Sequence, residues 1–520
     1  MKRSRQRVDI DLEELRRVLD QARQQPIGEA DYLKMKVALD VLAERLTPKR
    51  TTEKTRTVVA QPELAGSATV PPDDGGPGAK KGHGRNSAAA YTGARKVEIR
   101  HAKLGCGDAC PECARGKVYT QRQPKTLVRI VGQPPVEATV FEMERLRCNA
   151  CGQVFTAEEP EGVGPDKYDA TAIALIAQLK YGSGVPFARL ERMEGQMGIP
   201  LPAATQWELM EQGAAVLNPA FDQLLWQAAQ GEVLYNDDTG MRILRLARAP
   251  SDKRTGIFTS GIVSLWRGAL GARKIALFFT GRQHAGENLA DVLKRRSEQM
   301  SSPIQMCDAL SRNTPKLTNG VKILLANCIA HGRRQFVDVA ANFPQECGYV
   351  LESLGMVYGN DAWTREQGMD AEQRLRFHQQ YSGPLMDQLH GWLEEQLAEA
   401  KTEPNSGLGK AISYLLNHWP ALTLFLREKG APLDNNLCER ALKKAILNRK
   451  NAMFYKTPNG AWVGDLFMSL IHTCELNGVN SFHYLTELHR HAEELKRTPG
   501  DWMPWNYGET LARMQSPAAA

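Results

Sequence analysis

The feature that most constrains the fold is a group of five short apolar runs between residues 231 and 332. They are rich in β-branched and aromatic residues and are bounded by glycine, proline or polar residues, a composition typical of strands. Between the third and fourth runs, residues 286–298 have the apolar spacing of a helix. Three strands, a helix and two further strands predict a mixed α/β sheet of RNase H-like type. The runs are EVLYNDDTG (232–240), GIFTSGIVSLW (256–266), KIALFFTG (274–281), PIQMCDAL (303–310) and VKILLANCIAHG (321–332).

Two of these runs end in carboxylates. Asp237 and Asp238 follow the apolar residues of the first run, and Asp308 follows those of the fourth. An acid beside a buried strand is costly unless a cation compensates it, and these two strands can be neighbours in a mixed sheet. Phosphoryl transfer on DNA uses divalent ions held by oxygen ligands from separate elements. We therefore predict a magnesium or manganese site here, with either Asp237 or Asp238 as the first acid.

The third acid that such a site needs is Glu439, in the segment DNNLCERALKKAILNRKNAMFY (434–455). A structural alternative is that Asn436 caps a helix on which Glu439 is the third residue, so that the two form a capping box. One acid beside five bases nevertheless suits a metal ligand next to a polyanion. The bases, which we expect to contact DNA phosphates, are Arg440, Lys443, Lys444, Arg449 and Lys450.

The fifth apolar run leads into a second group of candidate phosphate contacts. His331, Arg333 and Arg334 follow the strand-like residues in ANCIAHGRRQF (326–336). We expect them near the scissile phosphate. The alternative, a histidine that only satisfies the end of a strand, stays open on the sequence alone.

The cysteines point to a second kind of metal site. The knuckles CPEC (110–113) and CNAC (148–151) each place two thiols two residues apart, and a pair of such knuckles can complete a tetrahedral zinc site. Four-cysteine sites are closed, so this spacing predicts one structural zinc in a ribbon rather than a catalytic ion. The alternative is that the four thiols lie exposed in loops. The predicted ligands are Cys110, Cys113, Cys148 and Cys151, and Cys106 suits the spacing less well.

Composition divides the rest of this multidomain α+β chain. Short helices with glycine turns at residues 165–230 are typical of a helix-turn-helix or of a packing module. The predicted boundaries are 1–50 for an N-terminal helical segment, 51–82 for a flexible linker, 83–164 for a basic arm and zinc ribbon, 165–230 for a helix-turn-helix-like domain, 231–336 for the first part of an RNase H-like catalytic core, 337–431 for an all-helical insertion, 432–480 for the last part of the core with the third acid, and 481–520 for a C-terminal helix and tail.

Charge and hydropathy set limits on partners. The net charge of +7 permits a polyanionic partner without requiring one. No apolar stretch approaches the length of a membrane span, and the basic start MKRSRQRVDIDLEEL has no apolar segment behind it. We therefore expect no membrane association and a cytoplasmic location.

Several segments together resemble the transposases of the insertion-sequence-66 family, namely NDDTG, CDALSRN, NCIAHGRRQF and above all DNNLCERALKKAILNRKNAMFY. The similarity runs from about residue 80 to about residue 480. It implies a bacterial enzyme with three catalytic acids on an RNase H-like fold. The positions that match those acids are Asp237, Asp308 and Glu439, although Asp238 also matches an acidic position of the family. Cys328 and His331 match a Cys-x-x-His element near the active site.

The resemblance implies a DNA transposase. Such an enzyme binds the ends of its element, hydrolyses a phosphodiester and transfers the freed 3′-hydroxyl to target DNA, by a cut-and-paste or a copying route. It implies two magnesium or manganese ions per active site, double-stranded DNA as partner, a homodimer or higher oligomer, accessory proteins of the same element, and association with the nucleoid during action. Two alternatives remain: an RNase H-fold nuclease without strand transfer, and a non-catalytic zinc-ribbon DNA-binding protein.

Overall fold

The computed structural model describes residues 166–247, 254–268, 271–317 and 320–515, together with much of 102–164 and a few residues before that stretch. The predicted N-terminal helices and the linker lie outside the described residues, as does most of the basic arm. The chain divides into two compact units, one made of Met1–Pro62 and Asp222–Ile446, the other of Glu63–Phe221 and Leu447–Ala520.

The first unit is built on a five-stranded mixed sheet with the order β5-β4-β3-β6-β7. β3 and β4 pair antiparallel, as do β4 and β5, whereas β6 lies parallel to both β3 and β7. All five predicted strands are present, and the two that end in acids are neighbours, as predicted. This mixed sheet with its helices is compatible with an RNase H-like core. The strands are β3 Val233–Gly240, β4 Phe258–Gly268, β5 Gly271–Gly281, β6 Ile304–Cys307 and β7 Leu324–Asn327.

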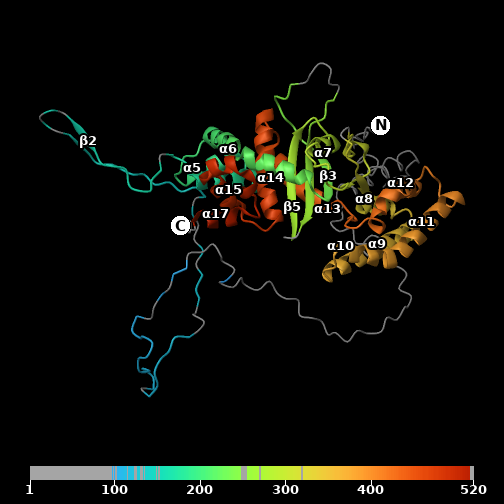
Figure 1. The fold of residues 1–520 in the computed structure, drawn as a ribbon, viewed down its shortest axis with the longest axis horizontal. Coiled ribbons are helices and arrows are strands. Elements are labelled where there is room, and N and C mark those ends of the chain that lie inside the picture. Colours follow the sequence, from blue (N-terminus) through green and yellow to red (C-terminus); the bar gives the residue numbers. More distant parts are fainter. Residues whose placement is uncertain are drawn as a thin grey trace, which may run out of the picture. The chain divides into compact units, whose positions relative to one another are not determined.

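Helices cover the two faces of this sheet. On one face, α7 (Ala285–Leu293) packs against β3 and β4, and the Asn288 amide donates to the Ser260 hydroxyl at 2.8 Å. Figure 1 shows α7 beside β3. On the other face, α13 (Asn436–Ala452) lies over β4, where a Cβ added to Gly261 would stand 2.9 Å from Leu442. Gly261 thus lets α13 approach the sheet closely.

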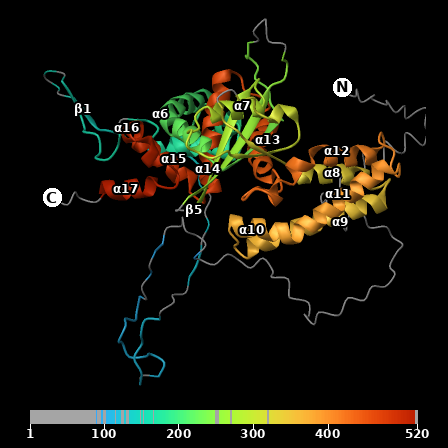
Figure 2. The ribbon, with the colours of Figure 1, turned by 45° about the vertical axis from the view of Figure 1, so that its right-hand side comes forward.

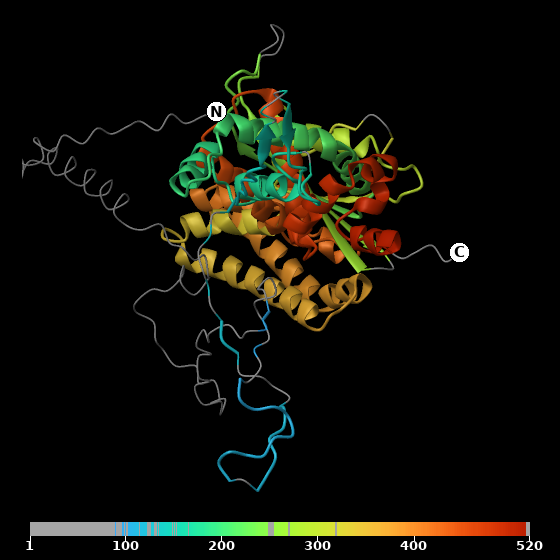
Figure 3. The same ribbon diagram turned by 90° about the vertical axis from the view of Figure 1, so that its left-hand side faces the viewer.

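Helices also form the predicted insertion. Figure 2 shows α8, α9, α11 and α12 side by side, and Figure 3 shows the same yellow and orange helices in stacked rows. The sequence predicted helices after the fifth strand, and the structure has helices there. The helices are α8 Ile329–Val339, α9 Pro344–Glu366, α10 Ala371–Phe377, α11 Gly383–Ala398 and α12 Gly407–Leu422.

A buried ion cluster joins α9 to α10. The Asp361 carboxylate is inaccessible to solvent and accepts from Arg365, from Arg374 at 2.5 Å and from His378 at 3.3 Å. Burial alone would raise the pKa of Asp361, but the His378 hydrogen bond and the two arginine charges hold it well below the usual range. Because a buried charge is tolerated only when it is paired, this cluster fixes how the two helices pack.

The second unit is mainly helical. The Asp169 carboxylate accepts the N–H of Ala172 and caps α4, and Pro186 directly precedes α5. The Tyr181 ring stacks on Phe467 at 5.3 Å, so that helices before the sheet share a core with helices near the C-terminus. These helices are α4 Ala170–Ala177, η2 Gln178–Gly182, α5 Phe187–Gln196, α6 Ala203–Ala229, α14 Pro458–Leu476, α15 Ser481–Arg490, α16 Ala492–Arg497 and α17 Tyr507–Gln515, with α6 and α13 each crossing between the units.

Within the described part of the chain, every helix is too short or too polar to cross a lipid bilayer.

Candidate active site

The two adjacent acids of β3 point to opposite faces of the sheet. In the antiparallel ladder, Asp237 pairs with Gly261 and Asp238 pairs with Ser260. Because side chains alternate along a strand, Asp237 lies on the side of α13, and Asp238 lies on the side of α7. The sequence could not choose between them as the first acid; the sheet separates their surroundings completely.

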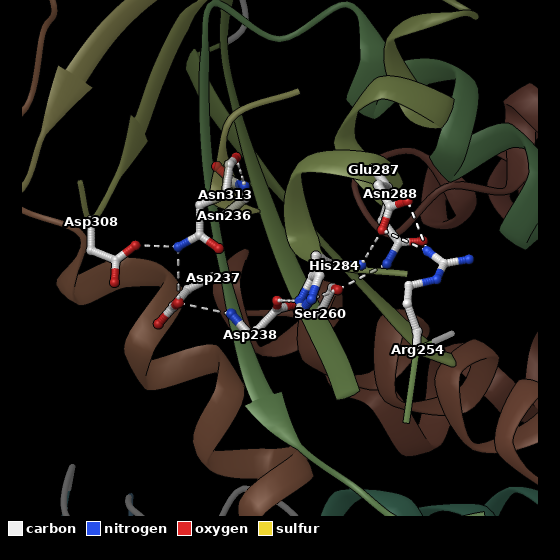
Figure 4. Close-up of polar contacts among 10 residues, drawn as sticks. All are labelled: Asn236, Asp237, Asp238, Arg254, Ser260, His284, Glu287, Asn288, Asp308 and Asn313. Carbon is white, nitrogen blue, oxygen red and sulfur yellow. Dashed lines mark hydrogen bonds and ion pairs between the residues drawn. The ribbon is translucent and has the colours of Figure 1, made fainter. Parts of the chain in front are cut away.

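Asp238 is engaged in a network that anchors α7. Its carboxylate accepts from the Ser260 hydroxyl at 2.7 Å and contacts His284 Nδ1 at 2.9 Å (Figure 4). His284 precedes α7, and its backbone N–H donates to Glu287, which in turn pairs with Arg254. The Asp238 side chain is only 1 % exposed. Its oxygens are therefore committed to structural hydrogen bonds.

This network predicts a stability effect at His284. Replacing it in His284→Ala removes one of the two side-chain donors to a buried carboxylate, which typically costs about 1–3 kcal/mol. Thermal unfolding should show a lowered midpoint, whereas His483→Ala, at an exposed histidine of α15, should leave the midpoint nearly unchanged. Equal midpoints for the two variants would contradict the anchoring role of the Asp238 network.

Asp237 and Asp308 come together around the amide of Asn313. If the β3–β6 register, in which Tyr235 pairs with Met306, is continued past the strand end, Asp308 stands opposite Asp237. The Asn313 amide nitrogen lies 3.3 Å from the Asp237 carboxylate and also donates to Asp308 (Figure 4). Asn313 belongs to the short helix η3 (Ser311–Asn313). Two acids from adjacent strand ends thus share one buried donor.

A second set of hydrogen bonds holds Asn313 in place. Its backbone carbonyl accepts from the side-chain amides of Asn236 and Gln305, each at 2.7 Å. The Gln305 amide also donates to Asn236 at 2.8 Å. All three side chains are inaccessible to solvent. Asn313 is the last residue of the segment CDALSRN, but its role was not predicted, because no spacing rule marks an asparagine five residues after an acid.

The electrostatics of this pair favour a cation. Burial raises the pKa of Asp237 to about 6, and the neighbouring Asp308 charge acts in the same direction. Asp308 is itself only 9 % exposed. The amide oxygen of Asn313 is buried without a hydrogen-bond partner, so that rotating this amide would present a third oxygen. Two carboxylates and an amide oxygen are the donors that a hard divalent ion prefers.

Glu439 lies in the first turns of α13, whose start is tied to β3. The Asn435 side chain donates to the carbonyl of Asn236 at 3.1 Å, and the Glu439 N–H donates to the carbonyl of Asn435. α13 begins at Asn436, so Asn435 is the residue directly before the helix, and the capping box considered for Asn436 and Glu439 does not fit this boundary. The Glu439 carboxylate lies 3.8 Å from His331 Nδ1. Among the predicted acids, Asp237 and Asp308 meet at the Asn313 amide, whereas Glu439 lies next to His331.

The predicted bases of α13 differ in how far they are exposed. Cys438, Leu442 and Ala445 are buried, and Ile446 is partly exposed. The exposed bases are Arg440, Lys443 and Lys450, whereas Lys444 and Arg449 are partly exposed. In α8, Arg334 is exposed and Arg333 is partly exposed.

One half of the predicted zinc site can be described. Backbone hydrogen bonds pair Gly107 with Val118, and the Cys110 N–H donates to the Gly116 carbonyl at 2.8 Å. Backbone N–H groups of Arg115 and Gly116, and then the Cys110 thiol, lower the pKa of the Cys113 thiol and so favour the thiolate that binds metal. Cys151 lies between β1 (Arg145–Arg147) and β2 (Val154–Thr156), but Cys148 lies outside the described residues.

Comparison with known proteins decides the family. A sequence profile described as the transposase IS66 family matches residues 167–462, which is more than half of the chain and includes all three acids. The chain belongs to the IS66 family of transposases. Divalent-metal use and a DNA substrate are general properties of such DDE transposases, and the oxygen donors at Asp237 and Asp308 fit them.

Relatives from Sinorhizobium fredii cover a similar part of the chain. The uncharacterized protein y4jD is 28 % identical over 377 residues, which is 70 % of this chain and 71 % of that protein. The uncharacterized protein y4hP is 26 % identical over 382 residues, or 71 % of this chain and 68 % of that protein. Neither name assigns an activity. The evidence for the chemistry of this IS66 family member is therefore the geometry of its site.

Proposed function

We propose that this chain is a DNA transposase that binds the ends of an insertion sequence, hydrolyses a phosphodiester there and transfers the resulting 3′-hydroxyl to target DNA. The proposed catalytic acids are Asp237, Asp308 and Glu439. The observation that carries the proposal is the meeting of Asp237 and Asp308 at Asn313, because two buried carboxylates so close together call for a divalent cation. The family match makes DNA phosphoryl transfer the corresponding chemistry.

The proposed residues would have separate roles in such a reaction. Asp237 and Asp308 would hold magnesium or manganese, with Glu439 as the third ligand from α13. A pair of such ions lowers the pKa of the attacking water or hydroxyl and stabilises the leaving oxygen. Asn313 would keep the two aspartates in register, and the start of α13, which carries Glu439, is anchored to β3 through Asn435.

The remaining groups would bind DNA and present it. Arg440, Lys443, Lys444, Arg449 and Lys450 on α13, together with His331, Arg333 and Arg334 on α8, would contact phosphates, so that binding weakens steeply with salt. Cys110, Cys113, Cys148 and Cys151 would hold one structural zinc in a DNA-facing ribbon. Two ends have to be joined, which calls for a dimer or higher oligomer. We expect the protein to act together with accessory proteins of the same element and in association with the nucleoid.

A strand-transfer assay tests the proposal. Pre-cut element ends with a free 3′-hydroxyl are incubated with the protein, magnesium and a plasmid target. The wild type should join the ends to the plasmid. Asp308→Ala should lower joining by more than about 100-fold, which is the upper range for losing a residue that only supports a metal ligand, and should still bind end DNA.

Asp291→Ala is the matched control, because Asp291 is a partly exposed acid of α7 that pairs with Lys294. It should join ends at the wild-type rate. Cleavage of uncut ends without joining would instead indicate a nuclease on the same fold. End binding with neither cleavage nor joining in the wild type would indicate a non-catalytic DNA-binding protein, and unchanged joining by Asp308→Ala would reject the assignment of that acid.

A further inference from the structure

A second cluster of metal-ligating side chains lies where α8 and α13 begin. Cys328, His331 and Glu439 each offer one ligand atom, and these three atoms lie within 4.8 Å of one another. Among the described residues, this is the group of histidine, cysteine and acidic side chains whose ligand atoms lie close enough together to hold one metal ion. Its donors are sulfur, nitrogen and oxygen, in contrast to the all-oxygen donors at Asp237 and Asp308.

The backbone positions two of these ligands together. Cys328 directly precedes α8 and His331 lies in the first turn of that helix, so the Cys-x-x-His spacing turns both side chains toward the same end. The Cys328 side chain is inaccessible to solvent, and its sulfur accepts the backbone N–H of Asn435 at 3.2 Å. This hydrogen bond links the sulfur to the residue directly before α13. The start of α13 then supplies Glu439 as the third ligand.

His331 gives an independent indication of a ligand. Its Nδ1 atom is shielded from solvent and has no hydrogen-bond partner. The Glu439 Oε1 atom is 3.8 Å from it, which is too long for a hydrogen bond. Zinc bonds of about 2.0–2.3 Å place two ligands of one ion roughly 3–4 Å apart. The His331–Glu439 separation therefore suits two ligands of a shared ion better than a direct contact.

We propose that Cys328, His331 and Glu439 form a site for one divalent cation of the zinc class. Thiolate and imidazole ligands favour zinc over magnesium, which prefers oxygen. Three protein ligands leave a fourth position open to water or to an oxygen of bound DNA. A small rotation of the side chains closes the ligand set around the ion. In this state the cation joins the start of α8 to the start of α13 and fixes the Glu439 carboxylate.

This site goes beyond the proposed function, with which it shares Glu439 and His331, but the evidence for it is the geometry of the cluster alone. The ligand set stands on the geometry of three side chains, whether or not Glu439 takes part in strand transfer. Metal binding can be measured without DNA, so a negative result here would leave the strand-transfer assay untouched. A negative strand-transfer assay would equally leave this site untouched.

Cobalt titration of the full-length protein tests the site. Co²⁺ replaces zinc and gives a charge-transfer absorption when a thiolate binds it. Metal-free wild type should bind one more thiolate-ligated Co²⁺ per chain than Cys328→Ser. His331→Ala should lose the same ion and serves as a second variant, because His331 is partly exposed and its loss disturbs the fold less. Excess magnesium should not displace this cobalt, whereas zinc should.

Cys347→Ser is the matched control, because Cys347 is equally buried, in α9, and is not part of the cluster. It should bind as much cobalt as the wild type, and cobalt at the Cys110 knuckle contributes equally to all these variants. If Cys328→Ser and His331→Ala both bind the same number of cobalt ions as the wild type, with the same charge-transfer intensity, the proposed site does not exist.

Discussion

Asp237→Asn should stabilise the metal-free protein at neutral pH while lowering strand transfer by more than about 100-fold. Burial raises the pKa of Asp237 to about 6, compared with 3.8 for an exposed aspartate. The native state therefore holds this proton more tightly than the unfolded state, and ionisation at neutral pH costs stability. A shift of this size corresponds to about 3 kcal/mol at most. Asparagine has nearly the same shape as aspartate but carries no charge. The variant therefore also loses the carboxylate that would bind the metal ion.

The pH dependence gives the sign of this effect. In chelator, the wild type should gain stability as pH falls through about 6 toward 4, because the raised pKa favours the protonated native state in that window. Asp237→Asn should lack this gain, so that the difference in thermal midpoint between the two proteins is largest above pH 7 and disappears toward pH 4. Magnesium should raise the midpoint of the wild type above pH 7 and leave that of the variant nearly unchanged.

Asp291→Asn supplies a control of opposite sign. Although some burial opposes it, the hydrogen bond from Lys294 lowers the pKa of Asp291, so that this carboxylate contributes stability above its unfolded pKa. Its removal should lower the midpoint slightly at neutral pH. If Asp237→Asn instead destabilised the metal-free protein at pH 7 as Asp291→Asn does, the Asp237 carboxylate would not be under electrostatic strain, and the argument for a cation there would fail.

The sheet was predictable because its signal is local. Apolar runs bounded by turn residues mark each strand, and β3 and β6 could be recognised as neighbours whose ends carry acids. Which helix each of Asp237 and Asp238 faces was not predictable, because it depends on which face of the sheet each helix covers. That choice is made by packing of α7 and α13 against Ser260 and Gly261, residues distant in sequence.

Asn313 and the cap of α13 show a second limit of sequence reasoning. Asn313 is important here because Asn236 and Gln305 hold its carbonyl, which is a tertiary arrangement with no sequence spacing of its own. At α13, either Asn435 or Asn436 has a side chain suited to a cap. In the structure the helix begins at Asn436, and the Asn435 amide donates to the carbonyl of Asn236, a residue far away in the sequence.

Gly286→Ala should disturb the site from the other side of the sheet. A Cβ at position 286 of α7 would lie 2.6 Å from the carbonyl oxygen of Thr314 and 2.7 Å from that of Arg312. These are backbone atoms on either side of Asn313, so the methyl group can be accommodated only if α7 and η3 move apart. Overpacking of this kind typically costs about 1–3 kcal/mol, and we expect a lowered thermal midpoint.

The same movement should reduce activity, because Asn313 is the donor shared by Asp237 and Asp308. A displacement of about 1 Å in catalytic groups can cost about 100-fold in rate, which the strand-transfer assay would detect. Gly355→Ala is the matched control, since that glycine lies exposed in α9 with open space around its Cβ position, and alanine there should raise stability by about 0.5–1 kcal/mol. Wild-type joining by Gly286→Ala would mean that the position of Asn313 does not control the two aspartates.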